Sequence, residues 1–206
     1  MLYHSYNTEA FVLGGLPVGE SSRFVFLFTK DLGLVGARVQ NARSVSSKLR
    51  YSLDDLSLSK VSLVRGRNVW RLTNAAPQKS LFSIFRNQPE ILLLVTRILG
   101  TIKMLVAGEE VNRELFSILN EAFLFLENES STEKLTVEEI KNAEVILMLR
   151  ILNNLGYFGS HNELGEFVVV AESPEKTWSR DLLSRMQKER SKAILVINSS
   201  LKASNL

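Results

Sequence analysis

The sequence contains no cysteine, only two histidines and no long uninterrupted apolar run. Without cysteine there are no disulfides, no thiolate zinc sites and no cysteine nucleophile, which fits a reducing cytoplasm. The most apolar run, residues 91–106, is too short for a membrane span and carries Arg97 and Lys103. We therefore expect no membrane helix. The first residues lack a basic stretch followed by an apolar core, so we also expect no signal peptide.

Motifs that carry catalysis are scarce. His4 lies near the terminus and His161 in a turn-rich stretch, and a lone histidine is more often structural than catalytic. The aspartate pair at 54–55 is of a type that binds Mg²⁺, but no third carboxylate follows at a suitable spacing, which favours a capping or solvated role. Residues 14–21 have the glycine spacing of a phosphate-binding loop, yet Glu20 stands where lysine is needed. We expect no enzymatic activity, no cofactor and no metal site.

Charge is divided unevenly along the 206 residues. Residues 1–80 carry eleven Lys/Arg and five Asp/Glu, a net charge of +6, whereas residues 81–206 carry fourteen and seventeen, a net charge of −3. With 45% hydrophobic and 23% charged residues, the chain has the composition of a folded protein of one large or two modest domains. A basic first part and an acidic second part indicate a polyanionic partner for the first part only.

Alternating apolar residues predict five strands between residues 8 and 75. The first expected strand ends at Gly14–Gly15, and the next three cover residues 23–29, 34–40 and 56–64. The fifth begins near Trp70, after a hairpin turn at 65–68. A change of phase between Leu58 and Val61 predicts a β-bulge near Lys60. Strict alternation also predicts that Trp70 and the Phe24, Phe26 and Phe28 stripe belong to the core rather than to a base-stacking surface.

Five short strands with a long connection before the fourth suit a small closed barrel such as the OB-fold. A different small antiparallel barrel or half-sandwich with a basic rim remains the alternative on pattern alone. Residues 74–80 contain Pro77 and mark a change to a helical period, so we place an OB-fold nucleic-acid-binding domain at 1–76 and a helical domain at 80–206. The predicted fold class is α+β, a five-stranded OB-fold barrel followed by an all-α domain.

The helical part has recognisable boundaries. Thr136 and Glu139 form a capping-box pattern that opens a helix ending before Gly156. A solvated loop is expected at 127–134 and a short buried strand at 167–171. The other helices are expected at 81–87, 90–106, 109–127 and 181–201.

The segment from Gly36 to Arg71 is the strongest functional signal, because it holds eight basic residues and two acidic ones. Each Lys or Arg that neutralises a phosphate releases condensed counterions, so such a barrel surface suits a nucleic-acid backbone. Tyr51 is the aromatic residue we expect to stack on bases. A solvated cationic surface without a ligand is the alternative. The last helix carries a second basic group, which we interpret as a solvated face (Arg180, Arg185, Lys188, Arg190 and Lys192). The predicted DNA-binding residues are Arg38, Arg43, Lys48, Arg50, Tyr51, Arg65, Arg67 and Arg71.

Several segments resemble, in order, the RecO family of recombination-repair proteins. They are TEAFVL, GESSRFVFLFTKDLGL, NARSVSSKLRYSL and VSLVRGRNVWRLTNA in the first part, and VILMLRILNNLGYFG in the helical part. The sequence departs from the family in two respects. Many relatives carry a four-cysteine zinc element where this chain has NELGEFVVVA, and two positions that are often basic are Leu34 and Ser44 here.

The resemblance implies a non-catalytic, cytoplasmic and nucleoid-associated mediator of recombinational DNA repair. Such a protein would bind single- and double-stranded DNA, promote strand annealing, and help to load a RecA-type recombinase together with a RecR-type partner and the tail of a single-strand-binding protein. Two other classes stay open on the residues themselves: an OB-fold RNA-binding factor, and a basic adaptor that grips an acidic protein.

Overall fold

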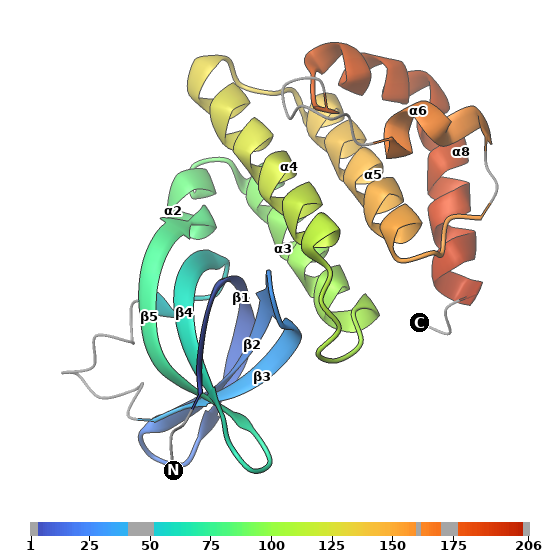
Figure 1. Ribbon diagram of the computed structural model, residues 1–206. Helices are drawn as coiled ribbons and strands as arrows, with labels where there is room; N and C mark the ends of the chain where they lie inside the picture. The colour runs from blue at the N-terminus through green and yellow to red at the C-terminus, as the bar shows by residue number, and fades with distance from the viewer. Residues whose placement is uncertain (1–3, 41–51, 160–161, 170–176, 204–206) are drawn as a thin grey trace. The chain divides into compact units, whose positions relative to one another are not determined.

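The computed structural model describes residues 4–40, 52–159, 162–169 and 177–203. Its contacts divide the chain into two compact units, Met1–Arg113 and Glu114–Leu206. In the described residues, the first unit contains five strands and two helices, and the second is helical (Figure 1). The predicted α+β class, with a barrel before helices, is confirmed. The proposed domain limits of 1–76 and 80–206 stay a prediction. The compact units divide the chain at a later point, and two helices group with the barrel in the first unit.

Five strands close into a barrel in the order β1-β2-β3-β5-β4, and β4 returns to pair with β1. The β3–β5 pair is parallel, and the other four pairs are antiparallel. This is the strand order of the predicted OB-fold. The strands are β1 (Ser5–Val18), β2 (Ser22–Thr29), β3 (Gly33–Val39), β4 (Ser57–Arg65) and β5 (Trp70–Ser80).

Alternate side chains of these strands fill the barrel. The buried cluster consists of Ala10, Val12, Val25, Leu27, Val35, Ala37, Val39, Leu53, Val61, Leu63, Trp70, Leu72 and Ala75. Trp70 is therefore in the core, as predicted. The phenylalanine stripe of β2 is not in this cluster, because Val25 and Leu27 take the inward positions. Phe24 and Phe26 are only half-buried on the outer face, so their assignment to the core is wrong, whereas Phe28 is fully buried, as predicted.

Strand β1 does not end at Gly14–Gly15 as predicted but continues to Val18. The register against β2 shifts between Val12 and Gly15, and Gly14 has a φ of +106°. A glycine in this conformation lets the strand make a bulge and continue. A Cβ on Gly15 would lie 2.4 Å from the backbone oxygen of Phe24, so close pairing at this point also requires glycine.

The bulge predicted in β4 near Lys60 is wrong, because the irregularities lie in β5, the neighbouring strand. The β1–β4 ladder runs without a break, and β4 keeps one phase because Ser59 occupies a core-facing position, where its Oγ donates to the Ser52 carbonyl at 2.8 Å. The register breaks lie in the β4–β5 ladder on either side of Lys60, and β5 supplies the extra residues, Thr73 and Gln78. Residues 74–80, predicted as a domain boundary, are the second half of β5.

Two helices complete the first unit. Helix α2 (Leu81–Phe85) follows β5 directly, and the Ser80 side chain caps it by accepting from the Ser83 backbone at 3.2 Å. Helix α3 (Pro89–Leu105) begins with proline, which suits a first helical position because its missing N–H would have no partner there. Helix α3 contacts β1 and β2, and its Lys103 Nζ lies 4.0 Å from the ring centroid of Phe26.

The second unit is built on α4 (Arg113–Thr132), α5 (Val137–Asn154), the short α6 (Gly165–Val168) and α8 (Arg180–Ala203), with a 3₁₀ turn at Asn162–Leu164. Helices α5 and α8 pack against each other. The strand predicted at 167–171 is wrong in its described part, where Gly165–Val168 is helical. The solvated loop predicted at 127–134 is wrong up to Thr132, because the helix continues to that residue.

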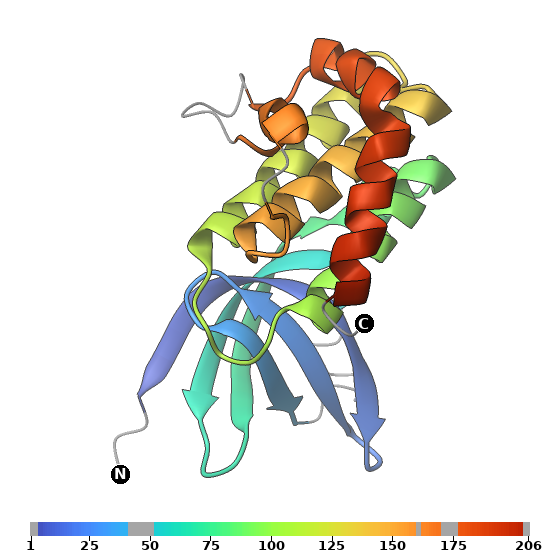
Figure 2. The ribbon, with the colours of Figure 1, turned by 90° about the vertical axis from the view of Figure 1, so that its right-hand side faces the viewer.

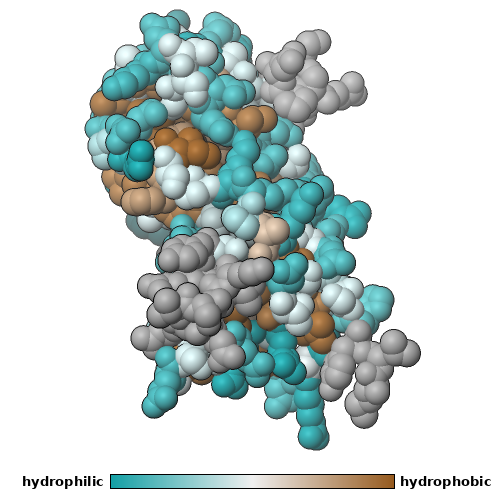
Figure 3. Space-filling view, turned by 90° about the vertical axis from the view of Figure 1, so that its left-hand side faces the viewer, coloured by the Kyte–Doolittle hydropathy of each residue, from teal (hydrophilic) through white to brown (hydrophobic). Residues whose placement is uncertain are grey.

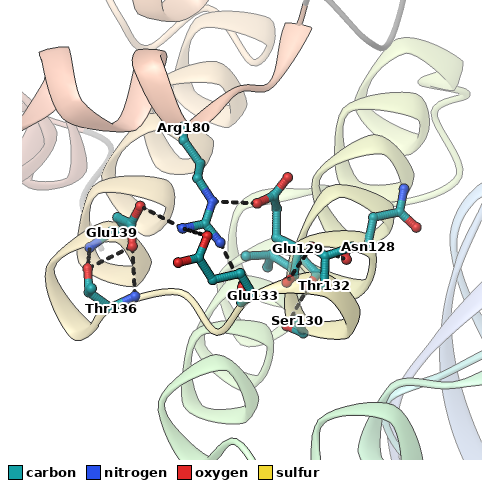
Figure 4. A network of polar contacts seen from close by, with 9 residues as sticks. Asn128, Glu129, Ser130, Thr132, Glu133, Thr136, Glu139 and Arg180 are labelled. Atoms are coloured by element: carbon teal, nitrogen blue, oxygen red, sulfur yellow. Dashed lines mark hydrogen bonds and ion pairs between the residues drawn. The ribbon is translucent and has the colours of Figure 1, made fainter.

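The capping box at Thr136 is confirmed and belongs to a larger polar network (Figure 4). The Arg180 Nε donates to Glu129 Oε2 at 2.6 Å, and this hydrogen bond raises the pKa of Arg180. Burial alone would raise the pKa of Glu139, but the hydrogen bonds from Thr136 and the charge of Arg180 outweigh it and leave that pKa below its ordinary value. The network fixes the start of α5 against α4 and α8.

Arg150 is the largest fully buried side chain of the second unit among the described residues. Its Nε donates to the Phe167 carbonyl at 3.0 Å and its Nη2 to the Thr177 carbonyl at 2.8 Å, while the guanidinium lies 4.4 Å from the ring centroid of Trp178. Burial lowers the pKa of Arg150 to about 10, and the charge of Glu121 opposes that effect. Arg150 thus links α5 to two separate segments of the chain.

Candidate nucleic-acid interface

Arg38 and Arg71 lie side by side on the outer face of the barrel. They are partners in the parallel ladder between β3 and β5, and both are exposed. Neighbouring strands are about 4.8 Å apart, so the two side chains leave the surface close together. Arg71 Nη2 donates to Gln40 Oε1 at 3.1 Å. Like charges placed opposite each other are unfavourable unless an anion lies between or beside them.

The β4–β5 hairpin carries two more predicted residues. Its turn is closed by the Gly66 amide, which donates to the Val69 carbonyl at 3.1 Å, and Arg67 is exposed in the turn. Arg65 has a different environment, because it pairs with Glu109 and its guanidinium lies 5.0 Å from the ring centroid of Trp70. Three cations, Arg38, Arg67 and Arg71, have no carboxylate partner among the described residues.

The remaining predicted residues, Arg43, Lys48, Arg50 and Tyr51, lie outside the described residues. Ser44, one of the two departures from the basic pattern of the family, lies there as well. The other, Leu34, is half-buried in β3, and its amide donates to the Gly108 carbonyl at 2.9 Å. The structure thus brings four of the eight predicted residues together on β3, β5 and the adjoining hairpin.

Helix α8 provides an internal comparison, because most of its basic residues are paired with acidic ones. Arg180, Arg185, Arg190 and Lys192 each form ion pairs with glutamate side chains within the second unit. Such pairing neutralises the helix surface and agrees with the solvated role expected for it. In the barrel, by contrast, no carboxylate among the described residues neutralises Arg38, Arg67 or Arg71. In Figure 3 hydrophilic side chains cover most of the visible barrel surface, in the lower half of the view.

A small polar pocket adjoins this surface. It has a volume of about 240 Å³ and is lined by Phe24, Gly36, Glu109 and the hairpin residues 65–70. The Phe24 ring lies against Gly36, where an added Cβ would come within 2.5 Å of the ring. Sequence reasoning missed Phe24 and Glu109, since alternation alone does not say which face of β2 is outside, and Glu109 is distant in sequence.

No group of three or more His, Asp or Glu side chains suited to a metal ion occurs in the described part of the chain. Of the aspartate pair, Asp55 forms an ion pair with Arg23 at 2.5 Å, and the Asp54 carbonyl accepts from Ser57 Oγ at 2.7 Å. Residues 14–21 form the end of β1 and the turn into β2. In the ranges that the structure describes, no helix is long and apolar enough to cross a membrane.

Comparison with known proteins places the barrel in a family. A model of the recombination protein O N-terminal domain matches residues 1–81, which span the barrel and the first residue of α2. Residues 1–81 are thus similar to the N-terminal domain of the RecO family. Among its relatives is a DNA repair protein RecO from Thermodesulfovibrio yellowstonii, 28% identical over 78% of this chain and 61% of the relative.

Two further proteins named RecO are similar to this chain. The protein from Dehalococcoides mccartyi is 29% identical over 63% of this chain and 51% of its own length. The protein from Alkaliphilus metalliredigens is 25% identical over 83% of this chain and 65% of its own length. The chain thus spans between half and two thirds of these RecO relatives. Each of these three matches is longer than the barrel and therefore extends into the helical part.

Proposed function

We propose that this protein is a non-catalytic DNA-binding mediator of recombinational repair. One observation carries the proposal: Arg38 and Arg71 are adjacent in register on the outer face of the barrel, with Arg67 on the neighbouring hairpin, and none has a carboxylate partner among the described residues. The names of the RecO relatives point to the same process.

The mechanism we propose is electrostatic. Contacts to phosphates hold a strand without reading its bases, so the surface accepts any sequence. Two strands held near one cationic surface repel each other less, which favours their annealing without ATP. We include Arg43, Lys48, Arg50, Arg65 and Tyr51 as further contacts, along with help in loading a RecA-type recombinase through a RecR-type partner at the nucleoid.

The proposal is tested with a charge-reversal variant, Arg38→Glu/Arg67→Glu/Arg71→Glu. The assay measures annealing of two complementary oligonucleotides coated with single-strand-binding protein. The matched control is Lys134→Glu/Lys188→Glu/Lys202→Glu, which reverses three charges in the second unit. We expect the barrel variant to lose annealing and the control to keep it. Equal annealing by both variants would remove the proposal.

Competition decides which nucleic acid is bound. Unlabelled DNA and RNA of the same sequence are added to a complex with labelled single-stranded DNA. We expect DNA, single- or double-stranded, to displace the label at least as well as RNA. Displacement by RNA alone would favour an RNA-binding factor, and no binding to either polymer would favour an adaptor for an acidic protein.

We also propose that the tail of a single-strand-binding protein docks between α5 and α8. A groove of about 430 Å³ lies there, with Val145, Met148, Ile194 and Ile197 in its wall. Lys141, Arg190 and Glu144 line its side, so we assign the docking to the apolar wall, with Lys141 and Arg190 as contacts for the acidic groups of the tail. Titration of the C-terminal peptide of that protein against wild type and Ile194→Glu tests it, and equal affinity for both would exclude this groove.

A further inference from the structure

The loop after α3 places one carboxylate at the basic surface. Gly108, with a φ of +64°, turns the chain there, and its carbonyl accepts from the Leu34 amide of β3 at 2.9 Å. Gly33 lies directly under Glu110, where an added Cβ would come within 2.4 Å of the Glu110 carbonyl. Arg113 Nε donates to Asp31 Oδ1 at 3.0 Å at the far end. Figure 2 shows this loop crossing in front of the β2–β3 side of the barrel.

These contacts bring Glu109 to the hairpin. One carboxylate oxygen accepts from Arg65 Nη1, and the other accepts from Trp70 Nε1 at 2.8 Å. The side chains of Arg65 and Glu109 are 61% and 41% exposed, so solvent reaches the pair and an external anion can approach it. An exposed ion pair of this kind is weak and exchanges readily with competing ions. Glu109 thus occupies the position that an anionic ligand of Arg65 would take.

The surroundings of this pair suit one unit of a nucleic-acid strand. The pocket of about 240 Å³ is smaller than the cavities that bury drug-sized ligands and is of the size for a single base. Phe24 lines it as a half-buried aromatic ring held edge-on to Phe26, with centroids 5.3 Å apart. Aromatic rings are the usual stacking surface for unpaired bases. Phe24 is also the register partner of Arg38, so the pocket is continuous with the proposed phosphate surface.

We propose that this pocket is a one-nucleotide subsite for single-stranded nucleic acid, and that Glu109 closes it when no strand is bound. A backbone phosphate replaces the Glu109 carboxylate on Arg65, and the attached base lies on Phe24. This inference rests on the proposed function, because the strand reaches the pocket from the Arg38 and Arg71 surface. Glu109 then competes with the strand for Arg65. This competition lowers the affinity for the strand and keeps the subsite closed until a strand is bound.

The test compares Glu109→Gln with Glu110→Gln. Both substitutions remove one negative charge from the same exposed loop, but only Glu109 contacts Arg65, and glutamine retains an acceptor for Trp70. Binding of a fluorescent single strand is measured over a series of salt concentrations. We expect Glu109→Gln to bind about threefold more tightly at low salt, with a salt slope steeper by about 0.7, the value for one added phosphate contact. Glu110→Gln should show less than half of the affinity gain and no steeper slope.

Two further variants assign the parts of the subsite. Arg65→Gln added to Glu109→Gln should abolish the gain in slope. Phe24→Leu, which keeps an apolar side chain over Gly36, should weaken binding about tenfold in the Glu109→Gln protein and remove the quenching of a 2-aminopurine base in the strand. Equal behaviour of Glu109→Gln and Glu110→Gln, with wild-type binding still dependent on Arg38 and Arg71, overturns this inference alone. Failure of wild type to bind any strand overturns the proposed function as well.

Discussion

Arg38 and Arg71 are direct partners across the parallel β3–β5 ladder, which puts two positive charges on adjacent strands of one surface. Arg38 has no ion-pair partner in the described part of the chain, so this arrangement does not stabilise the fold by itself. Like charges in such a position cost free energy that binding to an anion can offset. A surface of this type is typical of a binding site and contrasts with the paired cations of α8.

The first prediction concerns the stability of the free protein. Arg38→Gln should raise the urea midpoint slightly at low salt, because it removes the repulsion from Arg71. The gain should disappear at about 0.5 M salt, where the Debye length falls below about 5 Å. Arg67→Gln is the control, since Arg67 has no register partner of the same charge. A lower midpoint for Arg38→Gln at low salt would show that Arg38 has a structural role.

The second prediction concerns two glycines of the first unit. Gly15→Ala should destabilise the protein by roughly 1–3 kcal/mol, because the new methyl group would lie 2.4 Å from the Phe24 carbonyl oxygen. Gly100→Ala should stabilise it by about 0.5–1 kcal/mol, because this position lies within α3 and an added Cβ has no neighbour within 4 Å. Urea unfolding measures both. Similar effects of the two substitutions would contradict the bulge geometry.

The third prediction concerns Arg150. Arg150→Met should lower the free energy of unfolding by about 3 kcal/mol, because it removes the hydrogen bonds to the buried carbonyls of Phe167 and Thr177 and the charge that compensates Glu121. Arg150→Lys should recover little, since an ammonium group cannot span both carbonyls. Lys188→Met, on the exposed face of α8, should change stability little. A stable Arg150→Met protein would show that these hydrogen bonds are dispensable.

The fourth prediction concerns pH. The pKa of Glu139 is lowered in the folded protein, so its carboxylate binds fewer protons there than in the unfolded chain. Its contribution is therefore present above the ordinary value of about 4.5 and is lost as the pH falls through the lowered pKa. Glu139→Gln should cost about 1 kcal/mol at pH 7 and much less at pH 3. A difference between wild type and variant that does not change with pH would rule out the charged capping box.

The fold was predictable where a local pattern decides it. Alternation located the five strands, and the spacing of Thr136 and Glu139 located the start of α5. The errors occur where tertiary contacts override the pattern. Pro77 indicated a boundary, yet it lies in β5 beside a bulge, a position that tolerates a missing N–H. The polar end of α4 stays helical because Arg180 of α8 anchors it, donating to Glu129 Oε2 and to the Glu133 carbonyl.

The candidate site was predictable in charge but not in its contacts. The concentration of arginine near Arg38 and Arg71 is visible in the sequence, but their adjacency depends on a parallel strand pair between residues 33 apart. The pairing of Arg65 with Glu109 depends on the path of the loop after α3. No local pattern contains either relationship.

The most direct test of the central claim is the salt dependence of single-strand binding by wild type and by Arg38→Gln/Arg67→Gln/Arg71→Gln. Each lost phosphate contact on a single strand changes the slope of log K against log salt by about 0.7. We predict a slope that is shallower by about 2 for the triple variant, with weaker binding at every salt concentration. An unchanged slope and affinity would contradict the claim that this face of the barrel binds nucleic acid.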